Sequence, residues 1–218
     1  MRPYVALLIG APGGGKGTIG KYIVRDFDFR HVSTGDLLRQ NIAMESPAGK
    51  EAAHFIARGR LVPDLIIIEL VATELRRGAQ RLLLDGFPRT APQAASLDAS
   101  TPVAAAINLD IPHAVIVERL GNRWIHGPSG RTYSYDFSPP KVRGIDDETG
   151  DLLIQREDDE PSTVEARLRT YREQTRPVVD HYRKRGILAS FEGTESKVIY
   201  DAVKRFLDSD IRRHAAQP

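Results

Sequence analysis

The sequence predicts an α/β fold with a parallel sheet, and three observations support this. Short apolar runs typical of strands alternate along the chain with segments of helical periodicity. The run Val5–Ile9 is apolar at every position, as in a strand that is buried on both faces of a sheet. This run leads directly into the glycine-rich stretch Gly10–Thr18, from which a helical pattern continues to Asp26.

Five strands are expected, and each is followed by a glycine or a polar residue. In chain order they are Val5–Ile9, His31–Ser33, Leu82–Leu84, Ala104–Leu109 and Ile187–Phe191. The residues at their carboxyl ends are Gly10, Ser33, Asp85, Asp110 and Gly193. Because parallel strands end at the same edge of a sheet, we expect these residues to surround a ligand site.

Helices are expected between the strands, bounded by capping and helix-breaking residues. They cover Lys16–Asp26, a segment opened by Thr34-Gly35-Asp36, Pro47–Arg58, Pro63–Arg77, Pro112–Arg123 and Glu195–Ile211. A further helix begins at Pro161 and ends at Gly186, with a kink expected at Pro177.

The segment from Ile125 to Pro161 interrupts this alternation. It has no long apolar run, contains several turn pairs, and is too long for an ordinary connection. Its aromatic residues, Tyr133, Tyr135 and Phe137, favour a folded unit over a disordered one. We therefore expect a small β-rich insertion that acts as a lid.

Composition excludes several classes of protein. The 218 residues carry 31 Lys+Arg against 29 Asp+Glu, and this balance does not indicate a nucleic-acid-binding protein. No cysteine is present, which excludes disulfides and cysteine-ligated metal sites. No apolar run approaches the ~18 residues of a membrane span, so no membrane association is expected. The first strand is expected so close to Met1 that no targeting peptide precedes it.

The stretch after the first strand fits the phosphate-binding pattern G-x-x-x-x-G-K, with Lys16 as its lysine. Glycines let backbone N–H groups turn toward an anion, and the following helix adds partial positive charge at its N-terminus. Gly17 follows the lysine, so the hydroxyl expected to face Mg²⁺ is that of Thr18. The alternative is a glycine-rich turn without a ligand, which the lysine and the flanking elements disfavour.

Asp85 and a set of arginines supply the remaining charge. A carboxylate at the end of a strand beside the phosphate loop can hold Mg²⁺ directly or through water, although a solvated turn aspartate is the alternative. The arginines considered are Arg39, Arg89, Arg119, Arg123, Arg131, Arg156 and Arg167. Phosphoryl transfer needs fixed positive charge around the moving group, and arginines beside a mobile insertion could deliver it on closure.

Together these residues resemble the adenylate kinase family of nucleoside monophosphate kinases over nearly the whole chain. The motifs are Gly10–Thr18, Ser33–Arg39, Gly59–Asp64, Asp85–Arg89 with Gln93, Arg123–His126, Pro128–Arg131, Phe137–Lys141, Gln155–Asp159 and Arg167. The lid is full-length, as in the long-lid form. Stretches such as Arg-Trp-Ile-His and Phe-Glu-Gly-Thr-Glu are most similar to the mitochondrial GTP:AMP phosphotransferase branch.

The resemblance implies a P-loop NTPase fold: a five-stranded parallel sheet flanked by helices, with a helical NMP-binding insertion and a small β-rich lid. The core would comprise 1–32, 63–124 and 162–218, the NMP-binding segment 33–62 and the lid 125–161. It also implies a monomer that binds ATP or GTP, AMP and ADP in the mitochondrial matrix, although the composition is equally that of a cytoplasmic protein.

The resemblance assigns roles residue by residue. The donor nucleotide would contact Gly13, Gly14, Gly15, Lys16, Gly17, Thr18, Arg119, Arg123, Thr132, Tyr133 and Glu195. AMP would contact Thr34, Gly35, Arg39, Arg60, Leu61, Val62, Gly86, Phe87, Arg89, Gln93, Arg156 and Arg167. The catalytic residues would be Lys16, Arg89, Arg123, Arg156 and Arg167. Mg²⁺ would lie at Thr18 and Asp85, through water, and the Gln93 amide would pair with the adenine edge.

Some family members hold a zinc ion on four lid cysteines. The corresponding residues here are His126, Ser129, Asp146 and Thr149, so we expect a hydrogen-bonded polar cluster and no zinc. The alternative for His126 is an ordinary surface histidine.

The expected activity is reversible transfer of the γ-phosphoryl group of a magnesium–nucleoside triphosphate to AMP. A P-loop nucleotide switch, or a kinase for another acceptor, is the alternative, and the sequence leaves ATP and GTP open as donors. Without ligand, the arginines Arg123, Arg156 and Arg167 are expected to repel Lys16 and keep the lid open.

Overall fold

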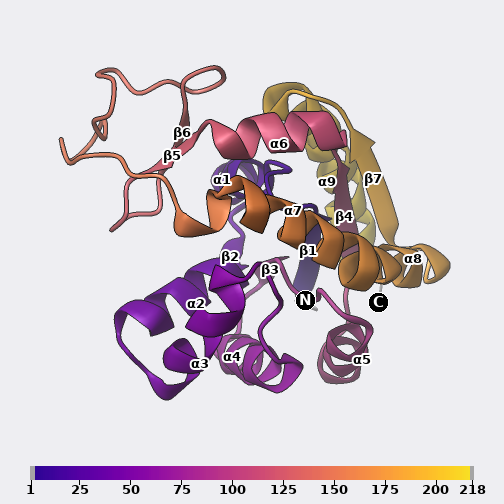
Figure 1. Cartoon of the computed structure of the whole chain (residues 1–218). Helices are drawn as coiled ribbons and strands as arrows, with labels where there is room; N and C mark the ends of the chain where they lie inside the picture. Colours follow the sequence, from indigo (N-terminus) through magenta and orange to yellow (C-terminus); the bar gives the residue numbers. More distant parts are fainter. Residues whose placement is uncertain (1–2, 217–218) are drawn as a thin grey trace.

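The computed structural model describes residues 3–216, which fold around a five-stranded sheet in the order β2-β3-β1-β4-β7 (Figure 1). All four pairings are parallel. The strands are β1 (Tyr4–Gly10), β2 (Arg30–Ser33), β3 (Arg81–Asp85), β4 (Ala105–Asp110) and β7 (Leu188–Glu192). The predicted α/β fold with five parallel strands is confirmed.

The helices follow the predicted order with one addition. They are α1 (Lys16–Phe27), α2 (Thr34–Ala43), α3 (Pro47–Ala57), α4 (Asp64–Arg76), α5 (Ala91–Ser100), α6 (His113–Gly121), α7 (Pro161–Thr170), α8 (Arg176–Lys184) and α9 (Ser196–Ala215). The patterns above did not predict α5, although a capping signal is present. The hydroxyl of Thr90 accepts a hydrogen bond from Gln93 N at 3.3 Å, and a proline lies in the first turn.

Two predicted helix features need correction. Helix α6 ends at Gly121, so Arg123 lies on a lid strand instead of at the helix end. The long helix after Pro161 is interrupted by a π-helical turn, η2 (Tyr171–Thr175), which lies between α7 and α8. Pro177 falls in the first turn of α8, and the residue four before it, Glu173, lies within the π-helical turn, so the interruption lies where this proline cannot supply the helical N–H.

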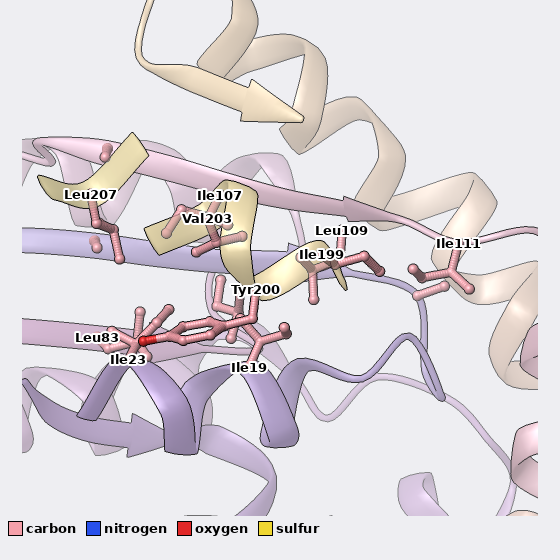
Figure 2. Close-up of a cluster of buried hydrophobic side chains, with 14 of the residues drawn as sticks. Ile19, Ile23, Leu83, Ile107, Leu109, Ile111, Ile199, Tyr200, Val203 and Leu207 are labelled. Carbon is pink, nitrogen blue, oxygen red and sulfur yellow. The ribbon is translucent and has the colours of Figure 1, made fainter. Parts of the chain in front are cut away.

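The core forms two apolar layers, one on each face of the sheet. Alternation along β1 places Leu8 in a cluster with residues of α1 and α9, and Leu7 in a cluster with residues of α4, α5 and α8. Figure 2 shows side chains of the first cluster, among them Ile23 of α1 and Tyr200 of α9. Both leucines are completely buried. The sheet is thus fixed between helices on both sides, and its carboxyl edge is left to carry the site.

Two insertions rise beside that edge (Figure 1). Helices α2 and α3 form one. The other is the lid, in which β5 (Arg123–Ile125) and β6 (Thr132–Ser134) pair antiparallel and the isolated bridge Ile125↔Ile154 extends the pairing. A 3₁₀ turn, η1 (Glu157–Asp159), leads back to α7. In residues 3–216, no helix is both long and apolar enough to span a membrane.

Candidate active site

A cleft of about 980 Å³ opens at the carboxyl edge of the sheet, between the core, the α2–α3 insertion and the lid. Its lining includes the phosphate loop, the ends of β2 and β3, and residues from both insertions. The lid reaches across toward α2, since a Cβ atom built on Gly130 would lie 4.0 Å from the carboxylate of Asp36. A cleft of this size can hold more than one small molecule.

The phosphate loop needs its glycines. Gly13 and Gly15 have φ of 77° and 81°, in the left-handed region, and a Cβ on Gly13 would lie 2.7 Å from the Leu120 side chain. Helix α1 begins at Lys16 without a side-chain cap. The first backbone N–H groups of α1 therefore remain available to an anion in the cleft, as the sequence predicts.

The Lys16 ammonium lies under this loop and donates to the carbonyl oxygens of Gly10 and Ala11, both at 2.8 Å. Burial lowers the pKa of Lys16 from 10.5 to about 8, and the nearby Asp85 carboxylate opposes this effect only in part. A bound polyphosphate would supply the negative charge that the lysine lacks in its surroundings.

Asp85 and Thr18 line the same cleft. Asp85 ends β3 and is 8% exposed, and its Oδ2 lies 3.5 Å from His31 Nε2. A carboxylate and a hydroxyl are hard oxygen ligands of the kind that Mg²⁺ takes, directly or through water. The donor set therefore fits the predicted ion.

Three of the predicted arginines form a paired cluster beside the lid. Arg123 Nε donates to Asp159 at 2.6 Å, and Arg156 contacts Asp158 through Nε and Nη2 at 2.8 and 2.6 Å. Arg167 Nη1 donates to the Asp158 carbonyl at 2.7 Å and to the Asp159 carboxylate at 3.0 Å. Burial lowers the pKa of Arg167 to about 10.

These pairs correct the electrostatic reasoning from sequence. That reasoning treated Arg123, Arg156 and Arg167 as free cations that repel Lys16, whereas Asp158 and Asp159 already offset two of the three positive charges. The two aspartates were not given a role, because the Gln155–Asp159 motif does not reveal which basic side chain each would meet after folding.

A smaller cavity of about 40 Å³ adjoins the cleft beneath α2. Of the predicted AMP residues, it is lined by Thr34, Arg60, Leu61, Val62, Gly86, Arg89 and Gln93, while Gly35, Arg39, Arg156 and Arg167 line the large cleft. Phe87 does not line either cavity. Its side chain is 3% exposed and packs in the apolar core, so a side-chain role for Phe87 is excluded by its position.

Gln93 is 1% exposed, and its amide is already engaged. Its oxygen accepts from Arg89 N at 2.7 Å and its nitrogen donates to Asp64 at 2.7 Å. Thr34 Oγ1 and Arg89 Nε both donate to the Gly86 carbonyl, at 2.9 and 2.7 Å. The small cavity is thus bordered by polar groups that hold one another in place through hydrogen bonds. Asp64 belongs to this network, and the sequence did not assign it a role.

At the opposite end of the cleft, the predicted donor residues Arg119, Thr132, Tyr133 and Glu195 all contribute to the lining. Arg119 Nη2 donates to the Thr194 carbonyl at 2.5 Å, and its guanidinium lies 5.6 Å from the centre of the Phe137 ring. From the sequence, Phe137 is expected in the lid and within the Phe137–Lys141 motif, with no nucleotide contact assigned to it. Its place in the cleft, half exposed, makes it a further candidate for contact with a base.

The lid is held by the predicted hydrogen-bonded cluster. His126 contacts Ser129 at 2.7 Å, and Asp146 accepts from Thr149 Oγ1 at 3.0 Å and from Tyr133 at 2.9 Å. Arg131 forms an ion pair with Asp146 and holds the pKa of this carboxyl far below its usual range. His126 is 2% exposed, so the surface-histidine alternative is wrong.

In the described residues, no group of three or more histidine, aspartate or glutamate side chains has the arrangement of a metal site. The lack of zinc stays a prediction.

Comparisons with known proteins agree with this arrangement. A family model described as "Adenylate kinase" matches residues 8–187. A protein named "GTP:AMP phosphotransferase, mitochondrial", from Drosophila melanogaster, is 47% identical over 207 residues, which cover 94% of this chain and 96% of the fly protein.

Proposed function

Because the chain belongs to the adenylate kinase family, we propose that it transfers the γ-phosphoryl group of a nucleoside triphosphate to AMP, reversibly, giving ADP and a nucleoside diphosphate. It is a nucleoside monophosphate kinase, a phosphotransferase whose acceptor is a phosphate group. The preferred donor is GTP, since the 47% identical fly relative is named for GTP and AMP.

The observation that carries the proposal is one cleft with two ends. Lys16 and the phosphate loop lie at one end, the Gln93 cavity adjoins the other, and the arginine cluster faces the space between them. The donor would occupy the loop and the Arg119 end, and AMP the α2–α3 side. Residues 33–62 and 125–161 then act as the NMP-binding segment and the lid on a core formed by the rest of the chain.

No side chain is needed as a nucleophile. Lys16 and the guanidinium groups would orient the phosphates in line and stabilise the charge that spreads over the transferred group. Arg156 and Arg167 would exchange part of their contact with Asp158 and Asp159 for phosphate oxygens. Mg²⁺, held by Thr18 and Asp85 through water, would neutralise donor phosphate charge when bound.

Closure of the lid would exclude water that could otherwise hydrolyse the donor. We also propose that the enzyme works as a monomer in the mitochondrial matrix, where the fly relative's name places that protein.

A coupled assay that combines GTP, ATP and ITP with AMP, UMP, CMP and GMP tests the function. We expect phosphorylation of AMP well above the other acceptors, with GTP the best donor. Triphosphate hydrolysis that proceeds without any acceptor would instead identify a P-loop switch. A preference for UMP or CMP would identify a kinase for a different acceptor.

A further inference from the structure

Two polar groups at the Arg119 end of the cleft have no partner within residues 3–216. Arg119 Nη1 is buried and makes no hydrogen bond, whereas Nη2 of the same side chain donates to Thr194. The exposed carboxylate of Glu195 lines the cleft and forms no hydrogen bond or ion pair in this part of the chain. The nearby carboxylate of Asp136 is occupied, because it accepts from Asn122 at 2.8 Å.

The backbone fixes where Glu195 lies. Arg119 anchors the carbonyl of Thr194, the residue directly before it, and helix α9 begins directly after it. On the other side, a Cβ built on Gly15 would lie 3.0 Å from Ser196 Oγ, so this loop packs against the phosphate loop. If donor phosphates occupy the phosphate loop, the donor base lies at this end, between Arg119, Phe137 and Glu195.

We propose that Glu195 selects guanine over adenine as the donor base. The inference rests on the proposed function and adds to it the residue that discriminates between donors. Guanine presents the N1–H and N2–H₂ groups side by side, and a carboxylate can accept from both. Arg119 Nη1 is buried beside Gly15 and does not face the base, so the discrimination is assigned to Glu195 alone.

Adenine reverses this pattern. Its N1 atom carries a lone pair and its C2 atom carries only hydrogen, so a Glu195 carboxylate placed for guanine N1–H and N2–H₂ would lose water without gaining a hydrogen bond. The same side chain therefore attracts one base and disfavours the other. ITP separates the two contacts, because hypoxanthine keeps N1–H and O6 and lacks the N2 amino group.

The test compares Glu195→Gln and Glu195→Ala with the unchanged chain, using GTP, ITP and ATP as donors at saturating AMP. For the unchanged chain we expect kcat/KM to fall in the order GTP, ITP, ATP. Both substitutions should lower the GTP/ATP ratio about tenfold or more and leave the KM for AMP unchanged. The matched control is Glu192→Gln, an exposed carboxylate on β7 that does not line the cleft and should leave the ratio unchanged.

An unchanged GTP/ATP ratio in both Glu195 variants would overturn the inference. So would an equal loss with all three donors, since that result would mean that the side chain only supports the loop. Calorimetric binding of GTP and ATP without AMP measures the same ratio independently of turnover. If the unchanged chain does not phosphorylate AMP with any of the three donors, the proposed function fails. If AMP is phosphorylated but the donor ratio does not respond, the assignment of Glu195 alone fails.

Discussion

Replacing Lys16 with methionine should remove catalysis and leave the free energy of unfolding nearly unchanged. Burial lowers the pKa of this lysine from 10.5 to about 8, which corresponds to about 3 kcal/mol against the charged form. The side chain is partly exposed, so solvent reduces this penalty to about 2–3 kcal/mol. Methionine removes this burial penalty, because its side chain carries no charge.

The opposing effect is the loss of two charged hydrogen bonds, to the carbonyl groups of Gly10 and Ala11. At about 1.5 kcal/mol each they contribute about 3 kcal/mol. The two effects cancel to within about 1 kcal/mol, so the variant should fold normally. Turnover should fall about 10²–10³-fold, because Lys16 would contact charge that shifts in the transition state.

Urea unfolding and the coupled kinase assay measure the two effects separately, with Lys184→Met, an exposed lysine on α8, as the control. The pH dependence provides a second check. Because the folded-state pKa is lowered, the burial penalty is complete below pH 8 and disappears as pH rises to 10.5. The unchanged chain should therefore gain stability relative to the Lys16→Met variant over that window. A folded variant with near-normal turnover would refute the assignment of the phosphate loop.

Three further predictions concern the acceptor cavity and the lid. Gln93→Ala should raise the KM for AMP by about tenfold and change the donor KM little. The substitution leaves Arg89 N unpartnered beside the acceptor cavity and removes one of the hydrogen bonds to Asp64, which keeps its contact with Thr90. A change confined to the donor KM would show that the AMP site is misplaced. Asp146→Asn should loosen the lid at neutral pH, which would be measured as faster hydrogen exchange in the lid. The lid of the unchanged chain should loosen only as pH falls below about 4, since a carboxylate with a lowered pKa stabilises the fold above that range. Equal exchange in both chains at pH 7 would contradict this role. Distance labels at the exposed Val142 and Lys184 should approach each other when two adenosines joined by five phosphates are added, and no change in their distance would exclude closure of the lid.

The sequence was sufficient to predict features that depend on local pattern. The glycines and lysine of the phosphate loop, the buried run in β1 and the turn-rich lid each leave a signal within a few residues. The polar cluster around His126 was also predicted, because four positions of a known motif carry residues that hydrogen-bond to one another.

Features that depend on pairing across the fold could not be predicted in the same way. Arg123 and Asp159 are 36 residues apart and meet only when the lid strand returns to α7, so the pairing of the arginines with aspartates was missed. Asp64 and Gln93 are 29 residues apart, and their hydrogen bond needs α4 and α5 to lie side by side. Phe87 was predicted to contact AMP because it lies within a binding motif, but its side chain packs in the core.

The central claim is that one cleft binds two nucleotides and passes a phosphoryl group directly between them. Its most direct test is a single-turnover reaction of GTP labelled at the γ-phosphate, with AMP present or absent. We predict that the label appears as the β-phosphate of ADP when AMP is present, and that the labelled GTP stays intact when AMP is absent. Release of the label as inorganic phosphate at the same rate with and without AMP would contradict the claim.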